Sequence, residues 1–328
     1  MKSWKATGHF RGRAARTPRP AAWGHAVARH AGAAMLVVVG TAIAFCCGPP
    51  PMMFAADPQE KLDAARKWLE DARAAFAAGK TEEAVALASR AVEAAPNHAA
   101  VRLARARLYS QLRDHQAAVA DCDACLKLDE TLAEAWHLRA CERFKLNRIE
   151  ESLADFDRFV ELRPHQEREL WQRGIAYYYA GRYEAGARQF ESYQTFDDND
   201  VENVVWRYLC QARAAGPEQA RRQLYKVRND TRVPMMEIYA VFAGQAQPED
   251  VLAAAEAGTV PPEERTVRRF YAHLYLGLYF EAHGDAAQAR QHLFEAEKLK
   301  ISHYMWDVCR VHCDRLRADD ASQTDRVP

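Results

Sequence analysis

The chain has 328 residues, of which 49% are hydrophobic and 27% charged, and its formal charge at pH 7 is zero. This balance hides a division, because residues 1–56 carry seven lysines and arginines and no acidic residue, whereas the remainder has 45 acidic and 38 basic residues. Nucleic-acid affinity comes mainly from neutralising phosphates, so the mildly acidic body gives no reason to expect nucleic acid as a partner.

The basic head leads into an uncharged apolar run, Ala31–Cys47, which is followed by one glycine and three prolines at 48–51. Proline removes a backbone donor and clashes with the preceding turn, so it ends any helix here. This order is the pattern of an export signal, and the run also has the minimum length of a membrane span. We expect residues 1–56 to be an export signal or membrane anchor, with a spurious extension as the alternative. The body would then lie in the periplasm or cell envelope.

The residues leave the processing site of this head open. Ala42–Ala44 is an A-x-A match early in the run, and Phe54–Ala56 precedes Asp57, where the body begins. Ile43–Cys46 is similar to a lipoprotein box and makes Cys46 a candidate lipidation site, although Phe45 stands where a small residue is expected. The head is therefore predicted to be cleaved, retained or lipid-linked.

A repeat of 34 residues begins after the head. Pro96 and Pro164 end two helical stretches and lie 68 residues apart, and small and aromatic residues precede each proline at matching distances. This period and spacing are the signature of tetratricopeptide helix pairs. We predict four units within residues 57–200. They lie at 65–98, 99–132, 133–166 and 167–200.

The remaining chain keeps helical periodicity. Residues 201–269 lack the consensus and predict degenerate helical hairpins, whereas 270–317 should hold a fifth unit and a capping helix at 302–316, since the end of a solenoid needs a cap. The polar residues 318–328 are predicted to be a disordered tail. No segment alternates with period two, so the predicted fold class is all-α: an α-solenoid of stacked hairpins with a C-terminal capping helix.

The body contains no recognisable catalytic constellation. It lacks G-x-S-x-G, H-E-x-x-H, a phosphate loop and a dinucleotide fingerprint. Its six cysteines are interpreted as small buried residues, although export would permit disulfides, and they do not form a four-ligand metal site. Asp197–Asp200 lacks the glycine and distal glutamate of a calcium loop. We predict a protein without catalytic activity, metal or cofactor.

The first helix of each unit lines the concave surface of a stacked array. Positions two, five, nine, twelve and thirteen of that helix should point inward, and aromatic and arginine side chains there suit peptide binding. The alternative is that Trp171 and Tyr178 pack against the next hairpin. The predicted partner-binding groove consists of Arg73, Phe76, Leu103, Arg107, Gln111, His137, Cys141, Lys145, Arg168, Trp171, Ile175, Tyr178 and Tyr179.

One binding mode of such repeats can be tested on the sequence. Tetratricopeptide domains that bind chaperone tails hold the terminal carboxylate with a clamp of basic and amide side chains. The corresponding positions here are Leu69, Arg73, Ala104, Glu134 and Leu138, of which only Arg73 supplies a suitable group. We therefore do not expect carboxylate-clamp binding of chaperone tails.

The order of motifs from the fourth unit onward is more specific than the repeat itself. It runs from Arg173–Arg182 through Asp197–Asp200 and Trp206–Leu209 to Tyr275–Phe280. In this order the chain resembles NlpI-type bacterial envelope lipoproteins over about 167–316. The resemblance implies an adaptor that brings cell-wall hydrolases to a protease and that can dimerise. The first repeats match only the general consensus.

The sequence thus predicts a non-catalytic scaffold or adaptor of the bacterial cell envelope, whose concave groove binds proteins or peptides. Envelope hydrolases or proteases are the partners that the resemblance implies. The membrane would be contacted through the head if it is uncleaved or lipidated. The alternative is a structural protein of the envelope that self-associates, for example as a homodimer, without capturing clients.

Overall fold

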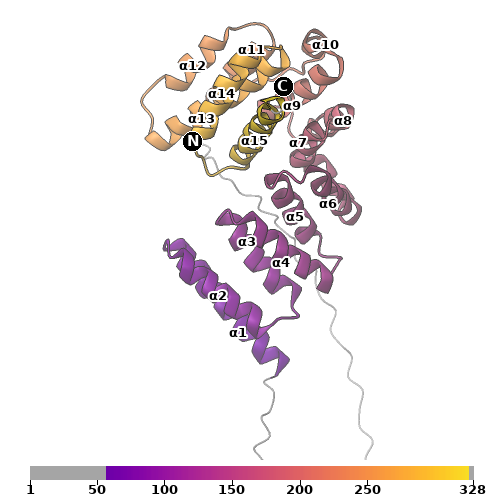
Figure 1. Ribbon diagram of the computed structural model, residues 1–328, viewed down its shortest axis with the longest axis vertical. Coiled ribbons are helices and arrows are strands. Elements are labelled where there is room, and N and C mark those ends of the chain that lie inside the picture. The colour runs from indigo at the N-terminus through magenta and orange to yellow at the C-terminus, as the bar shows by residue number, and fades with distance from the viewer. Residues whose placement is uncertain (1–56, 325–328) are drawn as a thin grey trace, which may run out of the picture. The chain divides into compact units, whose positions relative to one another are not determined.

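The computed structural model describes residues 57–324, and the predictions for the export head and for Cys46 lie outside this range (Figure 1). Within it the chain is helical and has no strand, which confirms the all-α prediction. The helices of the first four units are α1 (Pro58–Ala77), α2 (Thr81–Ala94), α3 (Ala99–Gln111), α4 (His115–Leu128), α5 (Ala133–Lys145), α6 (Ile149–Leu162), α7 (Trp171–Tyr179) and α8 (Tyr183–Tyr193). The later ones are α9 (Val201–Ala215), α10 (Pro217–Arg222), α11 (Met235–Phe242), α12 (Pro248–Glu256), α13 (Pro262–Ala282), α14 (Ala286–Lys298) and α15 (Tyr304–Thr324). A short 3₁₀ helix, Pro164–Glu169, lies between α6 and α7.

The first eight helices form four successive hairpins that stack in chain order, because α2, α4 and α6 each pack against the first helix of the following unit. Each hairpin turns at the same repeat position with a positive φ. Gly79 and Gly181 occupy this position in the first and fourth units, and Arg113 (φ 64°) and Asn147 (φ 58°) occupy it in the second and third. The turn needs this left-handed residue because the amides around it bond the last carbonyls of the first helix.

Small residues at the eighth repeat position let the two helices of a hairpin approach closely. A Cβ atom added at Gly174 would lie 2.6 Å from the ring of Phe190, and one added at Gly277 would lie 2.6 Å from Leu293. Ala106 and Ala140 fill the same position in the second and third units and are fully buried. The repeat consensus is thus a packing requirement.

A ladder of arginine contacts ties the first four units together. An arginine at the seventh repeat position contacts the second helix of its own unit and that of the preceding unit. In the third unit, Arg139 bonds both oxygens of Asp155 at 2.7 and 2.9 Å and also Asp123 at 2.5 Å. The equivalents are Arg105 with Asp121 and Ser89, and Arg173 with Gln189 and Asp157. Charge-assisted paired bonds of this kind fix the register between neighbouring units.

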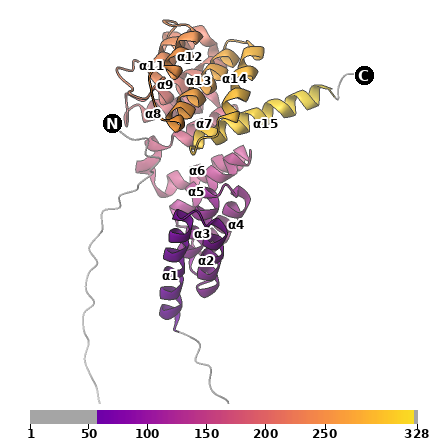
Figure 2. The same ribbon diagram turned by 90° about the vertical axis from the view of Figure 1, so that its left-hand side faces the viewer.

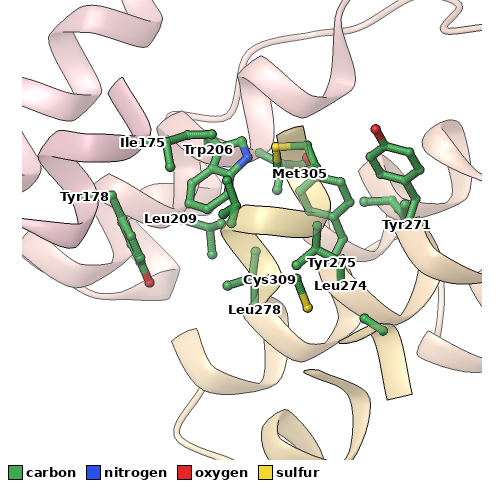
Figure 3. Packing of buried hydrophobic residues seen from close by; sticks show 14 of the residues in the cluster. Ile175, Tyr178, Trp206, Leu209, Tyr271, Leu274, Tyr275, Leu278, Met305 and Cys309 are labelled. Atoms are coloured by element: carbon green, nitrogen blue, oxygen red, sulfur yellow. The ribbon is translucent and has the colours of Figure 1, made fainter. Parts of the chain in front are cut away.

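The hydrophobic core is unevenly distributed along the chain. Small clusters made largely of alanines hold the first two units, whereas one continuous cluster runs from α5 to α15. Trp206 of α9 and Tyr271 and Tyr275 of α13 are almost completely buried within this cluster (Figure 3). The α13–α14 hairpin is the predicted fifth unit, and it belongs to this larger core.

The terminal helix differs from the prediction. α15 extends to Thr324, so the described part of the predicted disordered tail is helical and projects beyond its neighbours (Figure 2). Ion pairs with α14 account for this length, because Arg317 pairs with Glu297 and Asp320 pairs with Arg290 at 2.6 Å. Among the helices between 57 and 324, none has both the length and the apolar character required to cross a membrane.

Candidate partner-binding face

The predicted groove residues divide into two groups along the predicted inner face. We call the part on α1 and α3 the open half, and the part on α5 and α7 the covered half. In the open half, Arg73, Arg107 and Gln111 are exposed and Phe76 is half-buried. Leu103 is only 5% exposed and packs in a cluster with Leu126, so its assignment to the groove was wrong. The open half thus presents cationic and amide groups beside one aromatic ring.

The two arginines of the open half have no anionic partner among the described residues. Neither Arg73 nor Arg107 takes part in an ion pair of the described chain, although most arginines of the second to fourth units do. Exposed guanidinium groups without an anionic partner are available to bind carboxylates, and arginine does so with two parallel hydrogen bonds.

The covered half has no free groove. Ile175, Tyr178 and Tyr179 are at most 7% exposed, so their assignment as accessible anchors was wrong. Tyr178 packs edge-on against Trp206 with ring centroids 5.4 Å apart, and its hydroxyl lies 3.3 Å from Glu281. The alternative prediction, packing against the next hairpin, is therefore confirmed for Tyr178.

The other residues predicted for the groove in the later units also differ from accessible groove residues. The ring of His137 packs against Phe156 and Phe159 of α6, and burial lowers its pKa to about 4. Cys141 is buried, which raises the pKa of its thiol to about 12. Arg168 is exposed but lies on the 3₁₀ helix outside α7.

The N-terminal part of α15 covers this half. Its first residue, Tyr304, packs edge-on against Trp171 with centroids 5.3 Å apart and stacks on Phe144 at 5.7 Å. Lys145 lies over the ring of Tyr304 at 5.6 Å. The hydroxyl of Tyr179 bonds His312 of α15 at 3.0 Å. Aromatic side chains that we predicted to bind a partner therefore bind a helix of the same chain.

Two arginines of α15 bind the ends of the helices that it crosses. Arg310 donates to the carbonyl oxygen of Lys145, the last residue of α5, and Arg315 donates to that of Tyr179, the last residue of α7, at 3.0 Å. The final carbonyls of a helix lack partners within it and carry partial negative charge. Arg310 and Arg315 supply these carbonyls with a hydrogen-bond donor and with a positive charge.

A charged cluster marks the boundary between the two halves. Glu142 of α5 is fully buried and accepts hydrogen bonds from Ser110 at 2.7 Å and from Lys145 and His115 at 2.6 Å. Asp307 of α15, which is 2% exposed, pairs with Arg113 and lies 3.6 Å from His115. The guanidinium of Arg113 also lies over the ring of Trp306 at 4.3 Å. These contacts join the second unit to the start of α15.

The cluster perturbs the titration of its members in opposite directions. Burial favours the neutral form of Glu142, but the bond from His115 and the charge of Lys145 outweigh it and lower the pKa to about 2. Burial likewise opposes protonation of His115, whose bonds to Asp307 and Glu142 raise its pKa above 6.5. The contacts by which His115 links Glu142 of α5 with Asp307 of α15 are therefore stronger when His115 is protonated than when it is neutral.

Sequence reasoning missed this cluster and the position of α15. Glu142, His115 and Asp307 come from three distant segments, and no local spacing signals their meeting. The arginine ladder did have a signal, since Arg105, Arg139 and Arg173 recur every 34 residues with polar or acidic residues 16 positions on either side.

The described residues offer little for reactive chemistry. Between 57 and 324, no group of three or more histidine, cysteine or acidic side chains could hold a metal ion. All six cysteines of this part of the chain are buried and free, and burial raises the pKa of Cys125 to about 11. Such thiols stay protonated near neutral pH, and the thiolate is the reactive form.

Comparisons with known proteins identify relatives of part of this chain, including the units that carry the open half. Two family models described as tetratricopeptide repeats match residues 69–133 and 133–166. RNA polymerase II-associated protein 3 of Homo sapiens is 30% identical over 90 residues, which cover 27% of this chain and 14% of that protein. Hsc70-interacting protein 1 of Drosophila melanogaster is 26% identical over 117 residues, which cover 36% and 31%. The chain therefore spans less than a third of the length of either relative.

Several solved structures are also similar. The first TPR of Spaghetti (RPAP3), bound to an HSP90 peptide, has a TM-score of 0.30 and 28% identity, and the match covers 31% of this chain and 82% of that one. MamA has a TM-score of 0.47 and 14% identity, with 61% and 99% covered. The matched family models coincide with the helix hairpins, the left-handed turns and the 34-residue period described above. Residues 69–166 of this chain are therefore tetratricopeptide repeats.

Proposed function

We propose that the chain is a non-catalytic adaptor that binds partner proteins through the open half of its inner face. The observation that carries this proposal is the contrast within that face. Arg73 and Arg107 are exposed without an ionic partner, and Gln111 is exposed beside them, whereas α15 packs against the residues of α5 and α7. Protein binding is also the role named for the relative from Drosophila melanogaster, an Hsc70-interacting protein. Exposed arginine beside an aromatic ring is a common composition of binding hot spots.

The partner is not proposed to be the tail of a chaperone. Leu69, Ala104, Glu134 and Leu138 stand at the positions where a carboxylate clamp needs basic or amide groups. Glu134 would repel a terminal carboxylate, and the three apolar side chains cannot donate hydrogen bonds to it. The binding specificity should therefore differ from that of repeats that carry the clamp.

The proposed site of action is the bacterial cell envelope. The basic head, the apolar run Ala31–Cys47 and the candidate lipidation site Cys46 support export, and the resemblance to NlpI-type lipoproteins supports an adaptor for envelope hydrolases or proteases. Mass spectrometry of the mature N-terminus tests the export step. An N-terminus after Ala44, or an acyl chain on Cys46, is expected, and an unprocessed chain recovered from the cytoplasm would contradict this location.

The binding role is tested by capture from an envelope extract with matched charge reversals. We expect the wild-type chain to retain a partner that Arg73→Glu with Arg107→Glu loses by about tenfold or more. The control is Arg188→Glu with Arg222→Glu, which reverses two exposed arginines of α8 and α10. Calorimetry with the purified partner should reproduce the difference. Equal retention by all three proteins would contradict the proposal, and a stable oligomer that retains no client would favour the self-associating alternative.

A further inference from the structure

The covered half shows how this face holds a segment of chain. α15 lies across the ends of α5 and α7 as a helix, and its arginines bind the carbonyls of Lys145 and Tyr179. These two residues are 34 positions apart and occupy the thirteenth position of successive units. The contact is therefore made to a repeated feature of the backbone, which other units also possess.

The same feature is present in the open half. Ala77 and Gln111 are the last residues of α1 and α3 and stand at the thirteenth position of the first two units. Between residues 57 and 324, no other residue donates a hydrogen bond to either of these carbonyl oxygens. Helix-terminal carbonyls are polar and attract cationic donors, so the open half offers the backbone sites that α15 uses elsewhere.

The side chains of the open half add the requirement that the ligand carry negative charge. Arg73 and Arg107 occupy the ninth position, where the covered half has Cys141 and Ile175. α1 and α3 contact each other, and the axes of packed helices are about 8–10 Å apart. Two carboxylates seven residues apart lie on one face of a helix and are separated by about 10.5 Å along its axis. One helix can therefore reach both arginines.

We infer that the open half binds an amphipathic helix of a partner protein that carries two acidic residues seven positions apart, docked across the ends of α1 and α3 as α15 docks across α5 and α7. The acidic residues pair with Arg73 and Arg107, and a basic residue between them faces the carbonyl of Gln111 or Ala77. α15 itself has this arrangement, with Asp307, Asp314 and the intervening Arg310. The inference rests on the proposed function and names the class of ligand.

The test uses α15 as the probe. A fluorescent peptide of residues 302–318, with alanine at both cysteine positions, is added to the intact chain, and binding is followed by fluorescence anisotropy. The peptide is compared with one in which Asp307 and Asp314 are asparagine, and with one carrying Val311→Pro, which cannot form a continuous helix. We expect each change to weaken binding by about tenfold or more.

The chain variants locate the site. Arg73→Glu with Arg107→Glu should weaken peptide binding by about tenfold or more, whereas Arg188→Glu with Arg222→Glu should leave it unchanged. Binding that is insensitive to Arg73 and Arg107 would show that the peptide occupies another site, such as that of α15, and would overturn the inference.

Three further outcomes would also overturn it. The proline peptide binding as well as the helical one would indicate an extended ligand. Self-association that requires Arg73 and Arg107, measured by light scattering, would identify a second copy as the occupant. No binding of any peptide at about 1 mM would leave the face without a helical ligand of this class. The capture experiment remains independent, because a partner lost on charge reversal supports the proposed function whatever conformation it adopts.

Discussion

The two halves of the inner face are built from the same positions of one repeat, yet one is exposed and the other buried. At the ninth position, Arg73 and Arg107 face solvent, whereas Cys141 and Ile175 lie beneath other parts of the chain. The repeat therefore fixes the direction in which a side chain points. The later helices decide whether that side chain remains available to a partner.

Residue chemistry explains which half α15 covers. The ends of α5 and α7 present Phe144, Tyr178 and Tyr179, whose burial is favourable. The arginines of the open half could be buried only with compensating anions, because an unpaired buried charge is costly. Glu142 and Asp307 lie at the boundary, and each has ionic partners. The predictions below test this contrast.

The largest expected effect comes from placing a buried charge on α15, the helix that covers this half. Val308 of α15 is fully buried, so Val308→Asp should lower the free energy of unfolding by about 3–5 kcal/mol, as an uncompensated buried charge does. Chemical denaturation measures this change. The control, Ala318→Asp, adds the same charge at an exposed position of the same helix. Similar stabilities of the two variants would mean that α15 is not part of the core.

The ninth repeat position offers a direct comparison of the halves. Ile175→Ala should lower the free energy of unfolding by about 2–4 kcal/mol, because it removes a fully buried side chain and leaves a cavity. Arg107→Ala, at the same position of the second unit, should change it by less than about 0.5 kcal/mol. Denaturant titrations of both variants give the comparison, and a large loss for Arg107→Ala would show that the open half is not free.

The boundary cluster should contribute an intermediate amount to the free energy of unfolding. Glu142→Gln keeps the size of the side chain but turns an amide donor towards Lys145 and His115, so we expect a loss of about 1–3 kcal/mol. Glu184→Gln, at an exposed position of α8, serves as the control. An unchanged denaturation midpoint for Glu142→Gln would mean that the cluster does not hold the two segments together.

The smallest expected effect is the pH dependence of the stability that the same cluster provides. His115 is faced by Glu142 and Lys145 of α5, by Asp307 of α15 and by Ser110 and Arg113 of the second unit. Its raised pKa means that the folded chain binds this proton more tightly than the unfolded chain does. Its stabilising contribution is therefore complete below pH 6.5 and is lost as the pH rises through the raised pKa.

The measurement compares wild type with His115→Gln between about pH 6 and about pH 9. The difference in their free energies of unfolding should shrink as the pH rises. Burial lowers the pKa values of His137 and His303 to about 4 in the folded chain, and their effect on stability is the same in both proteins and cancels in the difference. A difference that stays constant or grows with pH would contradict the assigned role of His115.

Much of the fold could be predicted because its signals are local and repeated. The prolines and small residues at fixed distances defined the helix hairpins, and Gly79 and Gly181 marked the turns. Asn147 is in the same register and asparagine also tolerates this conformation, whereas the equivalent turn at Arg113 carries no such mark. The length of α15 was underestimated because its polar end is held by Arg290 and Glu297 of another helix.

The candidate site was predicted only in part, since position in the repeat does not report on exposure. Arg73, Arg107 and Gln111 are exposed, as a binding face requires, whereas Tyr178 and Tyr179 are buried against later helices. Aromatic side chains suit a peptide groove and a protein core equally well. Composition therefore could not decide between the two.

By itself, the sequence determined the helix pairs, their 34-residue register and the left-handed turn at one fixed position of each hairpin, because backbone geometry and close helix packing impose these through neighbouring residues. Only the tertiary structure decided that α15 covers one half of the inner face and that His115, Glu142 and Asp307 meet at its edge. Contacts such as Arg113 with Asp307 join residues 194 positions apart. They form because chain folding brings complementary surfaces together, which no local pattern encodes.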